Sequence, residues 1–76
     1  MSDEQLIPRE LDNQFTYHAP KKDQVSRYSE IREAGLDLAA AIYRCVPGCA
    51  DRSAAIRKVR EAVMTANAGI AITEAE

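Results

Sequence analysis

The sequence predicts an all-α fold: a two-helix antiparallel hairpin with an N-terminal arm, assembling into a compact helical homo-oligomer. Two long stretches carry apolar residues three or four positions apart, which is the period of an amphipathic helix. Between them lies "VPGC", in which Pro47 and Gly48 end a helix and favour a tight turn. With 76 residues, two cysteines and one histidine, the chain has a small core and few residues for disulfides or metal ligands. Self-association is therefore the expected supplement.

The chain divides into three parts. We expect residues 1–12 to form a flexible or short-helical acidic segment, residues 13–72 the hairpin domain with its arm, and residues 73–76 a tail. Residues 1–20 carry four acidic residues against Arg9, and this start lacks the basic and apolar regions of a signal peptide. No apolar run approaches the roughly 20 residues that span a bilayer. We therefore expect a cytosolic protein that does not bind a membrane.

The first long helix is expected to begin near residues 21–23, directly after Pro20, and to end at Val46. Asp23 lies in its first turn, where a carboxylate faces the positive end of the helix dipole. Gly35 costs about 1 kcal/mol of helix propensity relative to Ala, so we expect a partner or ligand to approach closely there. The apolar seam of this helix consists of Tyr28, Ile31, Gly35, Leu38, Ile42 and Cys45.

The second helix is expected to begin with Asp51 or Ser53 as its N-cap. Its matching seam consists of Ile56, Val59, Val63, Ala66 and Ile70. Apolar residues also remain outside the seams, and Leu36, Ala40 and Tyr43 form a second stripe on the first helix. A patch of this kind usually marks an association surface. Two explanations stay open: hairpins pack against one another through this stripe, or the arm folds back over it.

The charges and reactive side chains argue against several classes of function. The segment from Lys21 to Thr73 carries nine basic against six acidic residues, a sparse basic surface for long duplex nucleic acid. Cys45, Cys49 and His18 fall short of the four ligands of a structural zinc site, so free thiols are expected. No serine, cysteine or histidine has an evident partner for nucleophilic catalysis, and no glycine-rich loop could cradle a phosphate. We expect no enzyme, no metal and no cofactor.

The stretch "FTYHAPKKDQVSRY", residues 15–28, places aromatic and basic side chains at the start of the first helix. The free amides of the first turn favour an anion, and the basic side chains nearby are Lys21, Lys22, Arg27 and Arg32. Phe15 and Tyr17, two residues apart in an extended arm, would point the same way and could stack on a base, a contact worth roughly 1–3 kcal/mol. A nucleotide pocket and a core that buries Phe15 and Tyr28 remain equally open. A second basic stripe, or a solvated edge, consists of Arg57, Arg60, Met64 and Asn67.

Two segments resemble a known family. "FTYHAPKKDQVSRYSEIREAG" and "CVPGCADRSAAIRKVREAVMTANAGIA" resemble the small phage proteins of the anti-CBASS type 2 family, whose hairpin domain is shared with sponge proteins that act against Thoeris defence. The resemblance covers about residues 13–72, and its most specific pieces are the Phe-x-Tyr-His-x-Pro arm and "EAVMTANAGIA". It implies a non-catalytic sponge, a helical hexamer that sequesters the cyclic di- and trinucleotides made by bacterial CBASS enzymes. The protein would act in the cytoplasm of the infected bacterial host and keep the CBASS effector inactive.

The resemblance also implies binding residues. Cyclic dinucleotides would lie between protomers, and the matching positions are Tyr17 and Arg32, with Phe15, His18, Lys22 and Arg27 as further candidates from their position. A separate cyclic trinucleotide site near a symmetry axis would involve Arg57, Arg60 and Asn67. Members of the family often carry a bulky residue where this chain has Thr65. The alternative function is a helical-hairpin adaptor that binds a protein partner through the stripe of Leu36, Ala40 and Tyr43.

Overall fold

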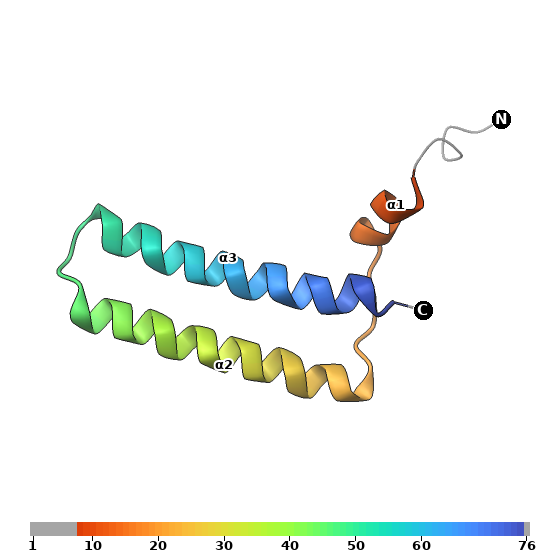
Figure 1. Ribbon diagram of the computed structural model, residues 1–76, viewed down its shortest axis with the longest axis horizontal. Helices are drawn as coiled ribbons and strands as arrows, with labels where there is room; N and C mark the ends of the chain where they lie inside the picture. The colour runs from red at the N-terminus through yellow and green to blue at the C-terminus, as the bar shows by residue number, and fades with distance from the viewer. Residues whose placement is uncertain (1–7, 76) are drawn as a thin grey trace.

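The computed structural model describes residues 8–75, and within this range the chain forms three helices and no strand. They are α1 (Arg9–Phe15), α2 (Lys22–Cys45) and α3 (Ala50–Thr73). α2 and α3 lie side by side and run in opposite directions, while α1 lies near the end of α3 (Figure 1). The predicted all-α class and hairpin domain are confirmed. Residues 1–7 of the predicted acidic segment lie outside the described residues.

The ends of α2 follow the sequence signals closely. The backbone N–H of Lys21 donates to Gln24 Oε1 at 2.8 Å, which satisfies a free donor at the start of the helix. The helix ends at Cys45, one residue before the predicted end. Val46 is already extended, because the ring of Pro47 disfavours a helical conformation in the residue before it.

α3 begins earlier than predicted. Cys49, and neither Asp51 nor Ser53, occupies the N-cap position, with an extended backbone and no side-chain cap hydrogen bond. The Ser53 N–H donates to the Cys49 carbonyl at 3.3 Å, so the helix is already formed at Asp51. The turn after Pro47 is short, so the backbone is already helical at Ala50, before the chain reaches Asp51 or Ser53. Asp51 instead lies in the first turn, where its carboxylate favours the positive end of the dipole.

Arg52 fastens the turn to the end of α2. Its guanidinium donates to the carbonyls of Tyr43 at 3.4 Å and Val46 at 3.3 Å, and it lies 4.4 Å from the centre of the Tyr43 ring. Carbonyls at the end of a helix lack partners within that helix, and the arginine supplies donors for them. Tyr43 nevertheless remains 62% exposed, so part of the predicted second stripe is open to solvent.

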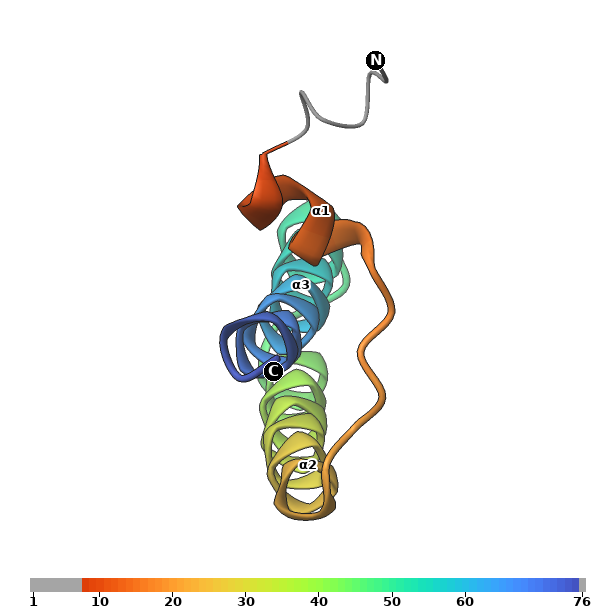
Figure 2. The same cartoon turned by 90° about the vertical axis from the view of Figure 1, so that its right-hand side faces the viewer.

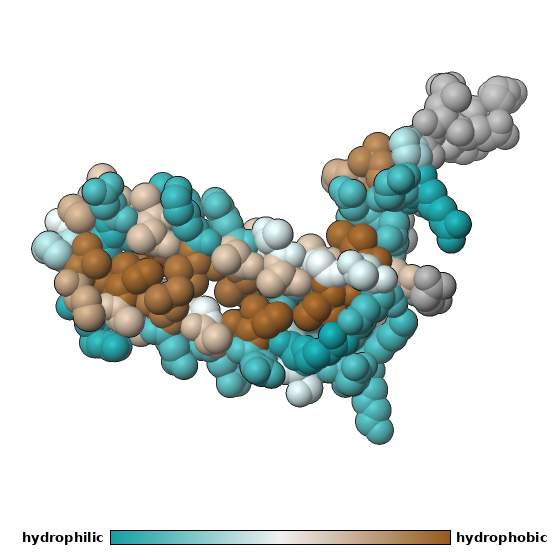
Figure 3. Space-filling model, in the orientation of Figure 1, coloured by the Kyte–Doolittle hydropathy of each residue, from teal (hydrophilic) through white to brown (hydrophobic). Residues whose placement is uncertain are grey.

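The two long helices approach closely at Gly35. A Cβ atom placed there would overlap a methyl group of Val63 and would lie 3.7 Å from a methyl group of Val59. The predicted close approach is confirmed, and its partner is the second helix of the same chain. The seams pack only partly, since no apolar residue of the described range is fully buried and Leu38 is 54% exposed. Figure 3 shows apolar residues gathered along the contact between α2 and α3, on a face that is open to solvent.

The arm, residues 16–21, crosses the end of the hairpin that lies opposite the turn. It runs from α1, beside the end of α3, to the start of α2 (Figure 2). The alternative in which the arm folds back over the second stripe is therefore wrong, and Leu36 is 68% exposed. No helix in residues 8–75 is both long enough and apolar enough to cross a membrane.

Candidate functional site

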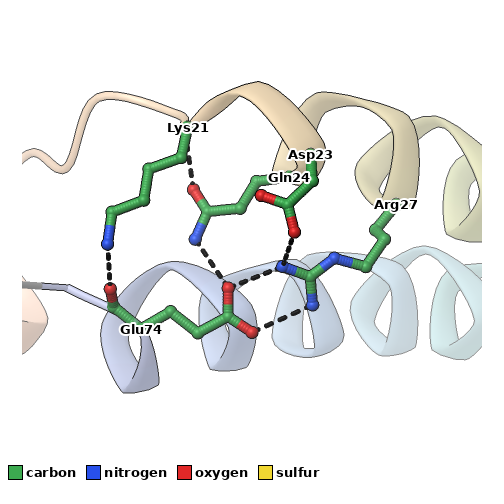
Figure 4. Close-up of polar contacts among 5 residues, drawn as sticks. All are labelled: Lys21, Asp23, Gln24, Arg27 and Glu74. Carbon is green, nitrogen blue, oxygen red and sulfur yellow. Dashed lines mark hydrogen bonds and ion pairs between the residues drawn. The ribbon is translucent and has the colours of Figure 1, made fainter.

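The start of α2 is joined to the end of α3 by a cluster of polar contacts, which we call the junction: Lys21, Asp23, Gln24, Arg27 and Glu74 (Figure 4). Two terminal nitrogens of Arg27 donate to the two carboxylate oxygens of Glu74, at 2.9 Å and 2.6 Å. Gln24 Nε2 donates to the same carboxylate at 2.9 Å, and Lys21 Nζ donates to the Glu74 backbone carbonyl at 2.7 Å. Asp23 adds a second acceptor for Arg27 at 3.3 Å. The arginine is thus bound by its own chain on two sides.

The electrostatics of the junction favour its charged form. The hydrogen bond from Arg27, and next that from Gln24, lowers the pKa of Glu74 from its usual 4.5 to about 2. The same hydrogen bond raises the pKa of Arg27. Gln24 is 3% exposed and is the most enclosed side chain there, whereas Arg27 and Glu74 are each 39% exposed. Paired carboxylate and guanidinium groups in this geometry are among the stronger hydrogen-bonded contacts in proteins.

α1, which precedes the arm, is also attached to the last turn of α3. Asn13 Nδ2 donates to the Ile72 carbonyl at 3.1 Å, and His18 Nε2 donates to the Asn13 carbonyl at 2.7 Å. A polar cleft of about 440 Å³ lies beside these contacts, and its lining includes Arg9, Asp12, Asn13, Thr16, His18 and Ile72. His18, a predicted ligand contact, therefore uses one ring nitrogen to hold the arm.

The two predicted aromatic contacts of the arm are both exposed, but they are arranged differently from the prediction. Phe15 is the last residue of α1 and Tyr17 belongs to the arm, so the expected extended alternation of the two rings is wrong. α1 forms because Pro8 precedes it and acidic residues occupy its first turn, a combination typical of helix starts. Phe15 is 84% and Tyr17 is 82% exposed, which excludes the alternative in which Phe15 fills a core. Tyr28 is half-buried.

Arg32 lies at a different place on the hairpin, in a groove between α2 and α3. This groove has a volume of about 310 Å³, and its lining includes Gly35, Leu36, Val63 and Met64, together with Arg32 and Arg60. The family resemblance implies separate sites for Arg32 and Arg60, and the structure brings them to the same groove. A second, mainly apolar groove of about 440 Å³ lies on the other side of the same helix contact.

The predicted dinucleotide residues do not form one cluster within a single chain. Lys22 is exposed at the first position of α2, and a rise of about 1.5 Å per residue places Arg32 about 15 Å further along the axis. No hydrogen bond of the described residues joins Tyr17 to Arg32. Of the predicted trinucleotide residues, Arg57 is exposed, and Asn67 is half-buried with an enclosed Oδ1 that has no hydrogen-bond partner in the described part of the chain.

The sequence does not single out Gln24 or Glu74, although both are central to the junction. One signal in the sequence points to Glu74: it is an acidic residue just after the second long helix. An antiparallel hairpin brings the end of that helix beside the start of the first long helix, which carries basic residues. Within residues 8–75, no group of three or more His, Cys, Asp or Glu side chains could hold a metal ion, and Cys45 and Cys49 are exposed free thiols.

A comparison with protein families finds one model that spans most of the chain. The model described as "Acb2/Tad1, hairpin domain" matches residues 8–71. Comparison with curated proteins and with solved structures gives no match. The matched stretch contains α1, the arm, α2 and most of α3, and it stops just before Ile72 and Glu74.

Proposed function

The chain belongs to the Acb2/Tad1 hairpin-domain family, whose members are phage anti-defence sponges, and from this premise we propose that it sequesters cyclic di- and trinucleotide second messengers. Binding without cleavage would lower the free messenger concentration and leave the CBASS effector inactive in the cytoplasm of the infected host. The observation that carries the proposal is the family match over residues 8–71. The exposed aromatic and basic side chains of the arm and the groove are compatible with it.

The proposed cyclic dinucleotide site combines the arm of one protomer with α2 of a neighbour. Tyr17 and Phe15 present rings for stacking on bases, and Lys22 and Arg32 present full positive charges for phosphates. Because Lys22 and Arg32 lie about 15 Å apart along α2, the proposal has a second protomer complete this pocket. His18 and Arg27 remain candidates, although each already binds another part of its own chain.

A cyclic trinucleotide is proposed to bind at a second site that includes Arg57, Arg60 and Asn67. Asn67 supports this assignment because its enclosed Oδ1 has no hydrogen-bond partner among the described residues, and an unmatched buried acceptor is costly. Arg60 reaches the groove that also contains Arg32. Both sites need a homo-oligomer, which we propose to be a hexamer, and neither needs DNA, a metal or a cofactor.

The proposal is tested by calorimetry with a cyclic dinucleotide. Tyr17→Ala is expected to weaken binding about tenfold or more, because loss of a stacked base costs roughly 1–3 kcal/mol. Tyr17→Phe keeps the ring and serves as the matched control, with an affinity close to that of the wild type. Ligand released by heating is expected to be intact. Recovery of hydrolysed nucleotide, or equal binding by Tyr17→Ala, would contradict this site.

One observation favours a second candidate function, the protein adaptor. Leu36 and Tyr43 of the second stripe are 68% and 62% exposed, as a docking surface requires. Native mass measurements with and without cyclic nucleotides separate the two functions. An adaptor would show neither added ligand mass nor a ligand-induced rise in melting temperature, whereas a sponge would show both.

A further inference from the structure

The last turn of α3 holds both ends of the arm. Asn13, before the arm, donates to the Ile72 carbonyl, and Lys21, at its end, donates to the Glu74 carbonyl. The stretch between these two anchors carries Phe15, Tyr17 and His18. The two anchors are thus fixed on acceptors only two residues apart, one at Ile72 in the last turn of α3 and one at Glu74 just after it. The placement of the exposed Tyr17 ring therefore depends on the last turn of α3 and on where that turn lies relative to α2.

Arg27 and Glu74 determine where the last turn of α3 lies relative to α2. Both oxygens of the Glu74 carboxylate accept from Arg27, and Gln24 donates to one of them from an almost fully buried position. A phosphate that approached Arg27 would compete with this carboxylate, and displacing it would leave Gln24 without its acceptor. The Nε atom of Arg27 is enclosed and has no partner among residues 8–75, so this atom offers no exposed donor. Arg27 is poorly placed to contact a ligand directly.

We propose that Arg27 and Glu74 are positioning residues of the cyclic dinucleotide site, acting by fastening the end of α3 to the start of α2 so that the arm presents Tyr17 in a fixed place. The inference rests on the proposed function, and it assigns Arg27 a role different from direct contact with phosphate. A segment that is ordered before binding loses less conformational entropy when the ligand arrives. Glu74 lies beyond residues 8–71, which the family model matches.

A charge swap distinguishes positioning from direct contact. Arg27→Glu alone places two carboxylates together and is expected to weaken cyclic dinucleotide binding about tenfold or more, measured by calorimetry. The reversed junction combines Arg27→Glu and Glu74→Arg with Asp23→Asn and Gln24→Glu, because Asp23 and Gln24 suit only the wild-type direction of the pair. It restores an ion pair of reversed direction and is expected to recover an affinity within about threefold of the wild type. If Arg27 contacted phosphate, the swapped pair would bind as weakly as Arg27→Glu. That result would overturn the inference.

A milder variant keeps the test valid if Arg27→Glu fails to fold. Glu74→Gln retains the shape of the side chain and removes its charge, and Glu61→Gln is the matched control, because Glu61 is exposed on α3 and has no ion pair among the described residues. Without ligand, Glu74→Gln is expected to speed hydrogen exchange of the amides of residues 16–24 about tenfold, and Glu61→Gln to leave it unchanged. Unchanged exchange in Glu74→Gln would contradict the inference.

The failure of this inference and that of the proposed function are separable. If the wild type binds no cyclic nucleotide, the proposed function fails, and the hydrogen-exchange comparison still decides whether Glu74 orders the arm. If the wild type binds and Glu74→Gln binds equally well with an unchanged exchange pattern, the sponge function stands and the positioning role is refuted.

Discussion

At the scale of single residues, Glu74 shows how one carboxylate can organise a chain that has little core. Its carboxylate binds Arg27 and Gln24, and its backbone carbonyl binds Lys21. The contacts join residues about 50 positions apart in the sequence. Ion pairs this exposed usually contribute little one at a time, so the bidentate geometry and the almost buried Gln24 are what make this one structurally important.

The depressed pKa of Glu74 predicts a pH dependence of stability. Its pKa is about 2 in the folded chain against a usual 4.5, so the stabilisation is fully present above the unfolded value and is lost as the pH falls from 4.5 toward 2. Melting temperatures followed by circular dichroism are expected to be higher for the wild type than for Glu74→Gln at pH 7. This difference is expected to shrink steadily below pH 4.5. A difference that stays constant from pH 7 to pH 3, or an equal effect from Glu61→Gln, would contradict the assignment.

Sequence reasoning treats Arg27 as a ligand contact because a basic residue in the first turns of a helix attracts an anion. The pattern carries no information on where that anion comes from. A phosphate and the carboxylate of Glu74 satisfy the same guanidinium, and only the return of α3 to this position distinguishes them. The exposure of Tyr17 is equally unpredictable from the local sequence, since nothing in "FTYH" distinguishes a buried ring from an exposed one.

At the scale of elements, the breakers in the sequence predict the long helices well. Pro20 and Pro47 place the ends of α2 within a residue of the observed bounds, because proline restricts both its own conformation and that of its neighbour. The start of α3 is less predictable, since the cap position depends on how tightly the turn closes and on Arg52. α1 carries too short an apolar pattern for its period to be recognised, and its position on α3 depends on the long-range contact of Asn13 with Ile72.

Replacement by alanine is expected to have opposite effects on stability at two glycines of the long helices. Gly35→Ala gains about 1 kcal/mol of helix propensity, but its Cβ would overlap Val63, and overpacking typically costs about 1–3 kcal/mol. Val63 is β-branched and moves aside poorly, so net destabilisation is expected. In Gly69→Ala the new Cβ meets no atom of another element within 4 Å among the described residues, and the change is expected to stabilise the protein by up to about 1 kcal/mol. Urea unfolding of both variants measures the difference, and a Gly35→Ala protein as stable as Gly69→Ala would show that the helices separate easily.

At the scale of the whole molecule, the described chain is a single layer. Its shortest extent is 12 Å, which is about the diameter of one helix with its side chains. A layer of this kind has two faces and no interior, which explains why no apolar residue of the described range is fully buried. The exposed second stripe could be predicted from the sequence, because more apolar residues were present than one helix contact can cover. The geometry of any assembly could not, since it depends on surfaces of several copies at once.

The single-layer architecture predicts that stability depends on protein concentration. Analytical ultracentrifugation is expected to show an oligomer, six chains under the proposed function, and the melting temperature is expected to rise with concentration. Leu36→Glu, on the rim of the groove, is expected to shift the protein toward monomer. Leu11→Glu, an equally drastic change at an exposed position of α1, is the control and is expected to leave the assembly intact. A monomer with a cooperative melt at micromolar concentration would contradict the prediction.

The two grooves share Gly35, Val59 and Val63 in their linings, and this has an evolutionary consequence. A mutation at any of these three positions alters the linings of both grooves at once, so a change that suits an occupant of one groove also reshapes the other. Flanking positions such as Arg60 on one side and Lys58 on the other touch a single groove. Changes that adjust one groove alone are therefore easiest at the flanks, while a change at a shared position calls for compensation on the opposite face.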